Sequence, residues 1–224
     1  MSVFQRYAVY YSPDDPSLAA FGATWLGWDV EYGTPCQQPE IKDIRDITQT
    51  PRKYGFHGTL KPPFRLAKDM TAQALATDVE RLAASLAPVV LDGLELARLD
   101  QFLALVPKGD PSELSAMAFR LVSELDAYRA PPDASELARR RIKGLTKRQD
   151  SLLTRWGYPY VADEFRFHLT LTGKLSDAKL DATAKALGYA LPVLPAPFRL
   201  ESITLVGQRE DGMFQQIHRR RLTG

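Results

Sequence analysis

The residues best suited to chemistry lie in two similar pentapeptides. Residues 56–60 read Phe-His-Gly-Thr-Leu and residues 167–171 read Phe-His-Leu-Thr-Leu, so both follow the pattern Phe-His-x-Thr-Leu. In an extended strand successive side chains point to opposite faces, so a histidine and a threonine two positions apart share one face. Each pentapeptide is therefore predicted to be a strand with an apolar back and a His/Thr front.

Two such strands lying side by side would gather four polar side chains around one cleft: His57, Thr59, His168 and Thr170. One neutral imidazole could take a proton from an attacking water or hydroxyl while the other, protonated, gives a proton to the leaving oxygen. The two hydroxyls could hold the non-bridging oxygens of a phosphoryl group. The pattern favours metal-free cleavage at phosphorus, with either histidine as the acid. The alternative is that both are ordinary half-buried strand residues.

The sequence offers little for rival chemistries, and no cofactor or metal is expected. Cys36 is the single cysteine, which excludes an intramolecular disulfide and a cysteine-based zinc site. Two histidines without a His-x-x-x-His pair or an evident carboxylate triad make a poor set of metal ligands. No Gly-x-Ser-x-Gly elbow marks a nucleophilic serine. His218 has no threonine two residues later and is given no role.

Extending the same alternation adds three candidate substrate-binding residues to the front face: Lys61, Arg166 and Thr172. Lys61 and Arg166 would place positive charge at the rim of the cleft, which suits a substrate with a second phosphate or another anionic group. The alternative for both cations is ordinary solvation at a strand end.

Periodicity and turn residues predict the elements that hold these strands. Helices are expected at 17–28, 71–87, 112–129, 135–156 with an interruption at Gly144, and 177–187 ended by Gly188. Strands are expected at 7–11, 53–61, 89–99, 101–106, 165–172, 198–208 and 213–222, the second stopped by Pro62 and Pro63 and the last two joined by a hairpin turn. Residues 29–51 are expected to be mostly irregular.

The two halves of the chain repeat the same order of elements. In each, a short apolar strand leads to an Asp-Pro-Ser turn (residues 15–17 and 110–112), a helix, and later the pentapeptide strand. We therefore predict an α+β fold in which two pseudo-symmetric lobes, with antiparallel sheets flanked by helices, surround a central cleft. Residues 1–224 would form one bilobal domain, with lobes at about 1–100 and 101–224 and exchange of strands possible.

Composition limits the classes of partner. Of the 224 residues 45% are hydrophobic and 25% are charged, and the net charge is +2, so the chain can bury a substantial core and is not basic as a whole. No apolar stretch approaches the roughly 20 residues of a spanning helix. The single cysteine fits a reducing compartment. We expect a cytoplasmic protein that is not bound to membranes.

The segment from Arg139 to Arg155 is rich in arginine and lysine. A solvated helix face is one interpretation, and a positive flap over the cleft that favours an anionic substrate or a nucleic-acid end is the other. The aromatic residues at 156–160 could stack on a base or ribose, or pack in the core.

At the two motifs the sequence resembles the two-histidine (2H) phosphoesterase superfamily, whose RNA-ligase-like fold carries one His-x-Thr/Ser motif in each of two related lobes. More narrowly, residues 52–64 and 156–168 resemble a bacterial branch found alongside phosphonate-utilisation genes. The resemblance implies a metal-independent phosphodiesterase acting on a small cyclic phosphate, such as a cyclic ribose phosphate or cyclic nucleotide, in phosphonate metabolism. It leaves two alternatives: an RNA-end 2′,3′-cyclic phosphodiesterase or 2′-5′ ligase, and a non-catalytic phosphate-binding protein. The expected partner is a small phosphate-containing substrate, with an RNA end as the second candidate; the oligomeric state is not indicated.

Overall fold

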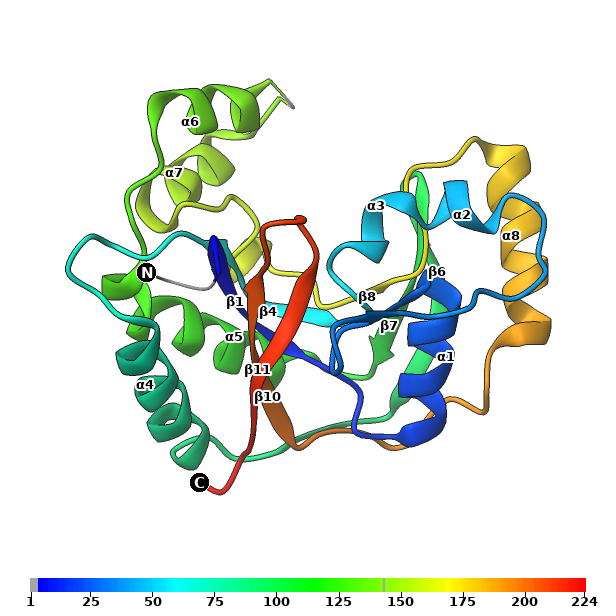
Figure 1. The fold of residues 1–224 in the computed structure, drawn as a ribbon, viewed down its shortest axis with the longest axis horizontal. Helices are drawn as coiled ribbons and strands as arrows, with labels where there is room; N and C mark the ends of the chain where they lie inside the picture. The colour runs from blue at the N-terminus through cyan, green and yellow to red at the C-terminus, as the bar shows by residue number, and fades with distance from the viewer. Residues whose placement is uncertain (1–3, 143) are drawn as a thin grey trace.

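A seven-stranded antiparallel sheet forms the centre of the computed structural model, which describes residues 4–142 and 144–224 (Figure 1). Its strands, in spatial order, are β11 (Phe214–Arg221), β10 (Ser202–Gln208), β1 (Arg6–Tyr11), β4 (Gly58–Phe64), β8 (Leu169–Thr170), β7 (Phe102–Lys108) and β6 (Gly93–Leu99). Two small sheets pair β2 (Trp28–Asp29) with β3 (Thr34–Pro35) and β5 (Val89–Leu91) with β9 (Phe198–Leu200). The strands that carry the two pentapeptides, β4 and β8, are therefore neighbours inside the large sheet.

Helices surround the sheet, as the sequence predicts. They are α1 (Pro16–Leu26), α2 (Ile44–Ile47), α3 (Gln49–Arg52), α4 (Ala72–Ala84), α5 (Ser112–Glu124), α6 (Ala134–Arg141), α7 (Lys147–Trp156) and α8 (Asp177–Ala190), with 3₁₀ turns at Asp126–Tyr128 and Ala162–Glu164. In Figure 1, α6 and α7 stand together near the start of β1, whereas α1 and α8 lie towards the other end of the molecule. The fold class is thus α+β with antiparallel sheets flanked by helices.

Local signals account for several helix boundaries. The Asp15 carboxylate accepts a hydrogen bond from the backbone N–H of Leu18, and Pro16 opens α1. The interruption expected at Gly144 is confirmed, because α6 and α7 are separate helices. Lys143, part of the basic segment, lies outside the described residues. The expected end of α8 at Gly188 is wrong: the helix continues to Ala190, since a single glycine weakens a helix by only about 1 kcal/mol.

The predicted strand boundaries also shift. Pro62 and Pro63 do not stop the first His/Thr strand, because β4 runs through both to Phe64. β8 pairs with β4 only at Gly58. Beyond Gly58, the edge of β4 that faces β8 forms no further strand pairing. The two prolines have no N–H group to donate, but along this edge no strand carbonyl needs one. The second His/Thr strand is shorter than the expected 165–172, with regular pairing at Leu169–Thr170 alone.

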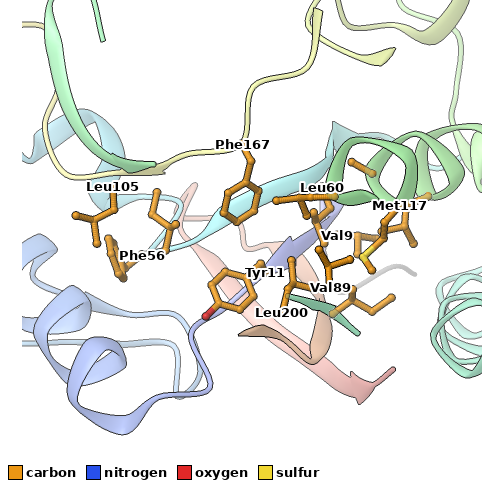
Figure 2. Close-up of a cluster of buried hydrophobic side chains, with 14 of the residues drawn as sticks. Val9, Tyr11, Phe56, Leu60, Val89, Leu105, Met117, Phe167 and Leu200 are labelled. Carbon is orange, nitrogen blue, oxygen red and sulfur yellow. The ribbon is translucent and has the colours of Figure 1, made fainter. Parts of the chain in front are cut away.

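Apolar side chains divide the sheet into two faces. On β1, Tyr7, Val9 and Tyr11 belong to the large core, whereas Ala8 and Tyr10 belong to a smaller cluster on the opposite face. Figure 2 shows part of the large core, where side chains from several elements meet on one side of the sheet. We call the large-core side the back face and the side of Tyr10 the front face.

In the large sheet, strands from the N-terminal and C-terminal halves of the chain lie next to one another. β10 and β11, from the C-terminal half, lie beside β1, and the β6–β7 hairpin spans the proposed boundary near residue 100.

Candidate active site

The register of β4 and β8 brings the two His-x-Thr motifs together. The strands are antiparallel and Gly58 lies opposite Leu169. One residue further on each side, His57 therefore faces Thr170 and Thr59 faces His168. Such cross-strand neighbours have Cβ atoms about 4.5–5.5 Å apart, and diagonal neighbours are about 7–8 Å apart. The two histidines thus lie on one diagonal of a compact group, the His/Thr quartet, made of His57, Thr59, His168 and Thr170.

Apolar packing on the back face holds this register. Phe56 and Phe167 are both buried, and Figure 2 shows Phe167 among the core side chains near Leu60 and Tyr11. Gly58 is required here, because a Cβ on it would overlap the Phe167 ring. A slip of one residue in either strand would turn its phenylalanine to the front and its histidine into the core.

Both imidazoles are held in the same way. Nδ1 of His57 donates to the Gly55 carbonyl at 2.9 Å, and Nδ1 of His168 donates to the Arg166 carbonyl at 2.8 Å, in each case two residues earlier in the chain. A carbonyl only accepts, so Nδ1 carries the hydrogen and Nε2 holds the lone pair of the neutral ring. The Thr59 hydroxyl donates to Nε2 of His57 at 2.9 Å. Both rings are therefore fixed in the tautomer that offers Nε2 for proton transfer.

Burial lowers the pKa of both histidines. Loss of water around the ring lowers the pKa of His57 from 6.5 to about 4; the hydrogen bond to Gly55 opposes this shift, and the charge of His168 adds to it. The pKa of His168 is also lowered by burial, against the opposing bond to Arg166. The direct electrostatic effect of His168 on His57 agrees with their diagonal placement.

An aromatic wall covers His57 on the front face. The Tyr10 ring stacks on the imidazole with centroids 3.7 Å apart, and the Tyr54 ring lies 6.2 Å away. The Tyr10 hydroxyl is buried and has no hydrogen-bond partner within residues 4–142 and 144–224. Burial and the neighbouring Tyr54 raise the pKa of Tyr10, while the charge of Arg6 opposes them. Tyr10 and Tyr54 were not among the predicted site residues. In the sequence, the alternation along residues 7–11 could have indicated Tyr10, because it places Tyr10 on the opposite face of the strand from Val9 and Tyr11.

Two of the candidate substrate-binding residues are not where the alternation placed them. A register shift between β1 and β4 sets Lys61 opposite Val9, while Thr59 lies opposite Tyr10, so Lys61 points to the back face. Lys61 is only 2% exposed, and its Nζ donates to the Val122 carbonyl in α5 at 2.9 Å. Burial lowers its pKa to about 8. The prediction of Lys61 at the rim of the cleft is therefore wrong.

Thr172 is buried too, and its hydroxyl is occupied by the backbone. It accepts from the Leu103 N–H at 3.0 Å and donates to the Gly173 carbonyl at 2.9 Å. These bonds tie the end of β8 to β7, which corrects the expectation of a free hydroxyl on the front face. Arg166 is exposed and forms no ion pair with any described residue, so its role as a cation at the rim stays a prediction.

Among residues 4–142 and 144–224, no group of three or more histidine, cysteine, aspartate or glutamate side chains is arranged to hold a metal ion. No helix in residues 4–142 or 144–224 combines the length and apolar character needed to cross a membrane.

Solved structures with distant sequences share the overall length of this chain. The crystal structure of TT0787 from Thermus thermophilus is 15% identical, with a TM-score of 0.43 and coverage of 98% of both chains. The structure of LigT from E. coli in complex with NADP⁺ is 14% identical, with a TM-score of 0.43 and coverage of 100% of both chains. The complex of the same protein with 3′-AMP gives 15% identity, a TM-score of 0.44 and coverage of 99% of both chains.

Curated relatives are closer in sequence and much longer. The ribose 1,5-bisphosphate phosphokinase PhnN of Janthinobacterium sp. (strain Marseille) is 37% identical over 92% of this chain and 48% of its own length. The protein of the same name from Laribacter hongkongensis (strain HLHK9) is 32% identical over 92% of this chain and 49% of its own length. The chain thus spans about half the length of these relatives. Residues 59–215, which include β8, all of β4 except Gly58, and three members of the quartet, match the family described as "Protein of unknown function (DUF1045)". The chain belongs to the DUF1045 family.

Proposed function

We propose that the chain is a metal-independent phosphodiesterase that opens a small cyclic phosphate at the His/Thr quartet. The observation that carries the proposal is the antiparallel pairing of Gly58 with Leu169, from which two histidines and two threonines become neighbours on one face of the sheet. Two opposed imidazoles supply both proton transfers of a displacement at phosphorus. The chemistry therefore needs no further group.

We assign the base role to His57 and the acid role to His168. His57, with a pKa of about 4, is neutral near pH 7 and can act as the base. His168 is the acid: burial lowers its pKa in the free protein, and the negative charge of the bound substrate raises that pKa again, so His168 takes up its proton together with the substrate. Water loses a proton to Nε2 of His57 and attacks phosphorus, the bond from phosphorus to one ribose oxygen breaks, and His168 gives its proton to that oxygen. The products are a phosphate monoester and a free hydroxyl, and the two protons balance.

The threonines orient the phosphate. Without substrate the Thr59 hydroxyl donates to Nε2 of His57. It cannot donate to two acceptors at once, so turning to a phosphoryl oxygen would release the lone pair of Nε2 for the attacking water. Thr170, opposite His57, would donate to another non-bridging oxygen as negative charge builds up.

A cyclic ribose phosphate that also carries a 5-phosphate is the substrate class we favour. Opening its ring at the 2-oxygen yields ribose 1,5-bisphosphate, the compound in the name of both curated relatives. This setting agrees with the phosphonate context that the sequence resemblance implies. The kinase activity in that name is not proposed for this chain, which has no Gly-x-x-x-x-Gly-Lys-Ser/Thr phosphate loop.

An RNA end is the less favoured substrate, because ion pairs neutralise three arginines of the basic segment. Arg140 pairs with Glu136, Arg141 with Asp150, and Arg148 with Asp163. These pairs lower the positive potential that would attract a polyanion.

Turnover of a substrate panel tests the proposal. The panel contains ribose 1,2-cyclic phosphates, cyclic mononucleotides and oligonucleotides with 2′,3′-cyclic ends. His57→Gln and His168→Gln are each expected to lower kcat by about 10²- to 10⁴-fold. His218→Gln is the matched control, because His218 is exposed on β11. Wild-type rates in both quartet variants would refute the assignment, and tight binding without turnover would indicate a binding protein instead.

A further inference from the structure

A cavity of about 320 Å³ lies between the sheet and α6, away from the His/Thr quartet. The strands contribute Arg6 of β1, Phe64 of β4 and Gln208 of β10, and α6 contributes Glu136 and Arg139. Arg65 and Arg129 lie where the chain beyond β4 pairs with a returning segment through the Leu66–Arg129 bridge. Four arginines and one glutamate therefore line a single space, which we call the arginine cavity.

Two of these arginines are already neutralised. Arg129 forms a 2.8 Å ion pair with Asp126, and Arg65 lies 3.5 Å from Asp133 and 3.6 Å from Glu136. The cavity's only carboxylate in the described structure, that of Glu136, is thereby engaged, and it also binds Arg140.

The other two arginines keep their charge uncompensated. Nε of Arg6 donates to the neutral Gln208 side chain at 2.6 Å. Arg139 forms no ion pair with any residue that the structure describes. The cavity thus has a surplus of about two positive charges, presented as guanidinium groups, whose planar fork matches the oxygens of a phosphate.

Arg6, one of the arginines of the cavity, lies on the same face of the sheet as the quartet. Arg6, Ala8 and Tyr10 alternate with the buried back-face residues of β1, and the Tyr10 ring stacks on His57. Along the strand, Arg6 is about 13 Å from Tyr10 at ~3.3 Å per residue, and the long arginine side chain shortens that interval. The charge of Arg6 already acts on Tyr10. Tyr10 itself is fully buried, so a ligand that extends from the quartet along the direction of β1 towards Arg6 passes over it and approaches the arginine cavity.

We propose that the arginine cavity binds a second phosphate, a phosphomonoester on the same molecule whose cyclic phosphate lies at the quartet; this inference rests on the proposed function. Arg6 and Arg139 are the two guanidinium groups that contact it. The cavity then selects substrates with phosphate at both ends. It also gives part of the basic segment a role, since Arg139 faces the cavity while Arg140, Arg141 and Arg148 are held in ion pairs.

The test compares ribose 1,2-cyclic phosphate with and without a 5-phosphate. In the wild type, kcat/KM is expected to be at least about 100-fold higher for the 5-phosphorylated compound, because two guanidinium groups contact the second phosphate. Arg139→Gln should reduce this preference by about 10- to 100-fold, as expected for loss of a hydrogen bond between charged groups. Arg139 is exposed, so the change does not threaten folding. Arg141→Gln is the matched control, because Arg141 lies two residues further along the chain in α6, bonds to Asp150 and does not line the cavity.

The outcomes separate this inference from the proposed function. An unchanged preference in Arg139→Gln would overturn the role of the cavity while leaving the quartet assignment intact. If the wild type turns over neither compound, the proposed function fails, and the cavity is tested by calorimetric titration with ribose 5-phosphate. Weaker binding in Arg139→Gln than in Arg141→Gln then supports it, and equal binding overturns it. Equal stimulation of both substrates by inorganic phosphate would assign the cavity to free phosphate and also overturn the inference.

Discussion

Burial of the His57 ring leads to a quantitative prediction about stability in acid. Its pKa falls from 6.5 to about 4 on folding, chiefly because the charged ring loses water. The unfolded chain therefore takes up a proton near pH 6.5, whereas the folded chain does not until about pH 4. Between these values the unfolded state binds more protons, so the free energy of unfolding decreases as the pH is lowered. About 2.5 pKa units at ~1.4 kcal/mol each correspond to about 3 kcal/mol.

Urea unfolding of the wild type and His57→Gln at neutral pH and at about pH 4 measures this contribution. Other titrating groups are common to both proteins, so the difference between them isolates His57. The wild type should lose about 3 kcal/mol relative to the variant across this range. An NMR titration of the His57 ring should show a midpoint near pH 4. If the free energies of unfolding of the two proteins differ by the same amount at both pH values, or if the NMR midpoint of His57 lies near pH 6.5, the ring is open to water and the reasoning is refuted.

Other perturbations address the back face and the metal question. Lys61→Met should raise the free energy of unfolding at neutral pH by about 1–3 kcal/mol in urea titrations, because an apolar side chain of similar size replaces a buried ammonium group. Activity should persist in this variant. Loss of activity would contradict the placement of Lys61 away from the quartet. Gly58→Ala should lower the free energy of unfolding by about 1–3 kcal/mol and also slow turnover, because the new methyl group overlaps the Phe167 ring. Gly188→Ala, with open space around it, should stabilise α8 by up to about 1 kcal/mol. Equal changes in the free energy of unfolding for both variants would exclude the overlap. Turnover should be the same with and without EDTA, and a loss restored by a divalent metal would count against the two-imidazole mechanism.

Alternation along a strand is local, and it correctly separated the front and back of each pentapeptide. Phe56 and Phe167 are in the core, and the histidines are bonded alike. The same rule failed at Lys61, because the register shift arises from pairing with β1, a strand far away in the sequence. The proline pair in β4 misled for a similar reason: whether a proline ends a strand depends on the neighbouring strand and not on the residue alone.

The surroundings of the quartet depend on tertiary pairing even more. The segment at 7–11 is recognisable as a strand, but only its position beside β4 places Tyr10 on His57. Likewise Arg6 and Arg139 are far apart in sequence; Arg6 belongs to no motif, and the basic segment that contains Arg139 does not reveal which of its residues faces the cavity. Such neighbours follow from topology, which a single sequence specifies only through all of its contacts together.

The pairing of Gly58 with Leu169 also has a kinetic consequence while the chain is being synthesised. Contacts between such distant positions form only after the entropy of closing a long loop has been overcome. A polypeptide still emerging from the ribosome contains His57 but lacks His168 until the segment that forms β8 is synthesised. Any reaction that needs both rings therefore starts only after β8 has been synthesised and has paired with β4, and recovered turnover during refolding reports this pairing.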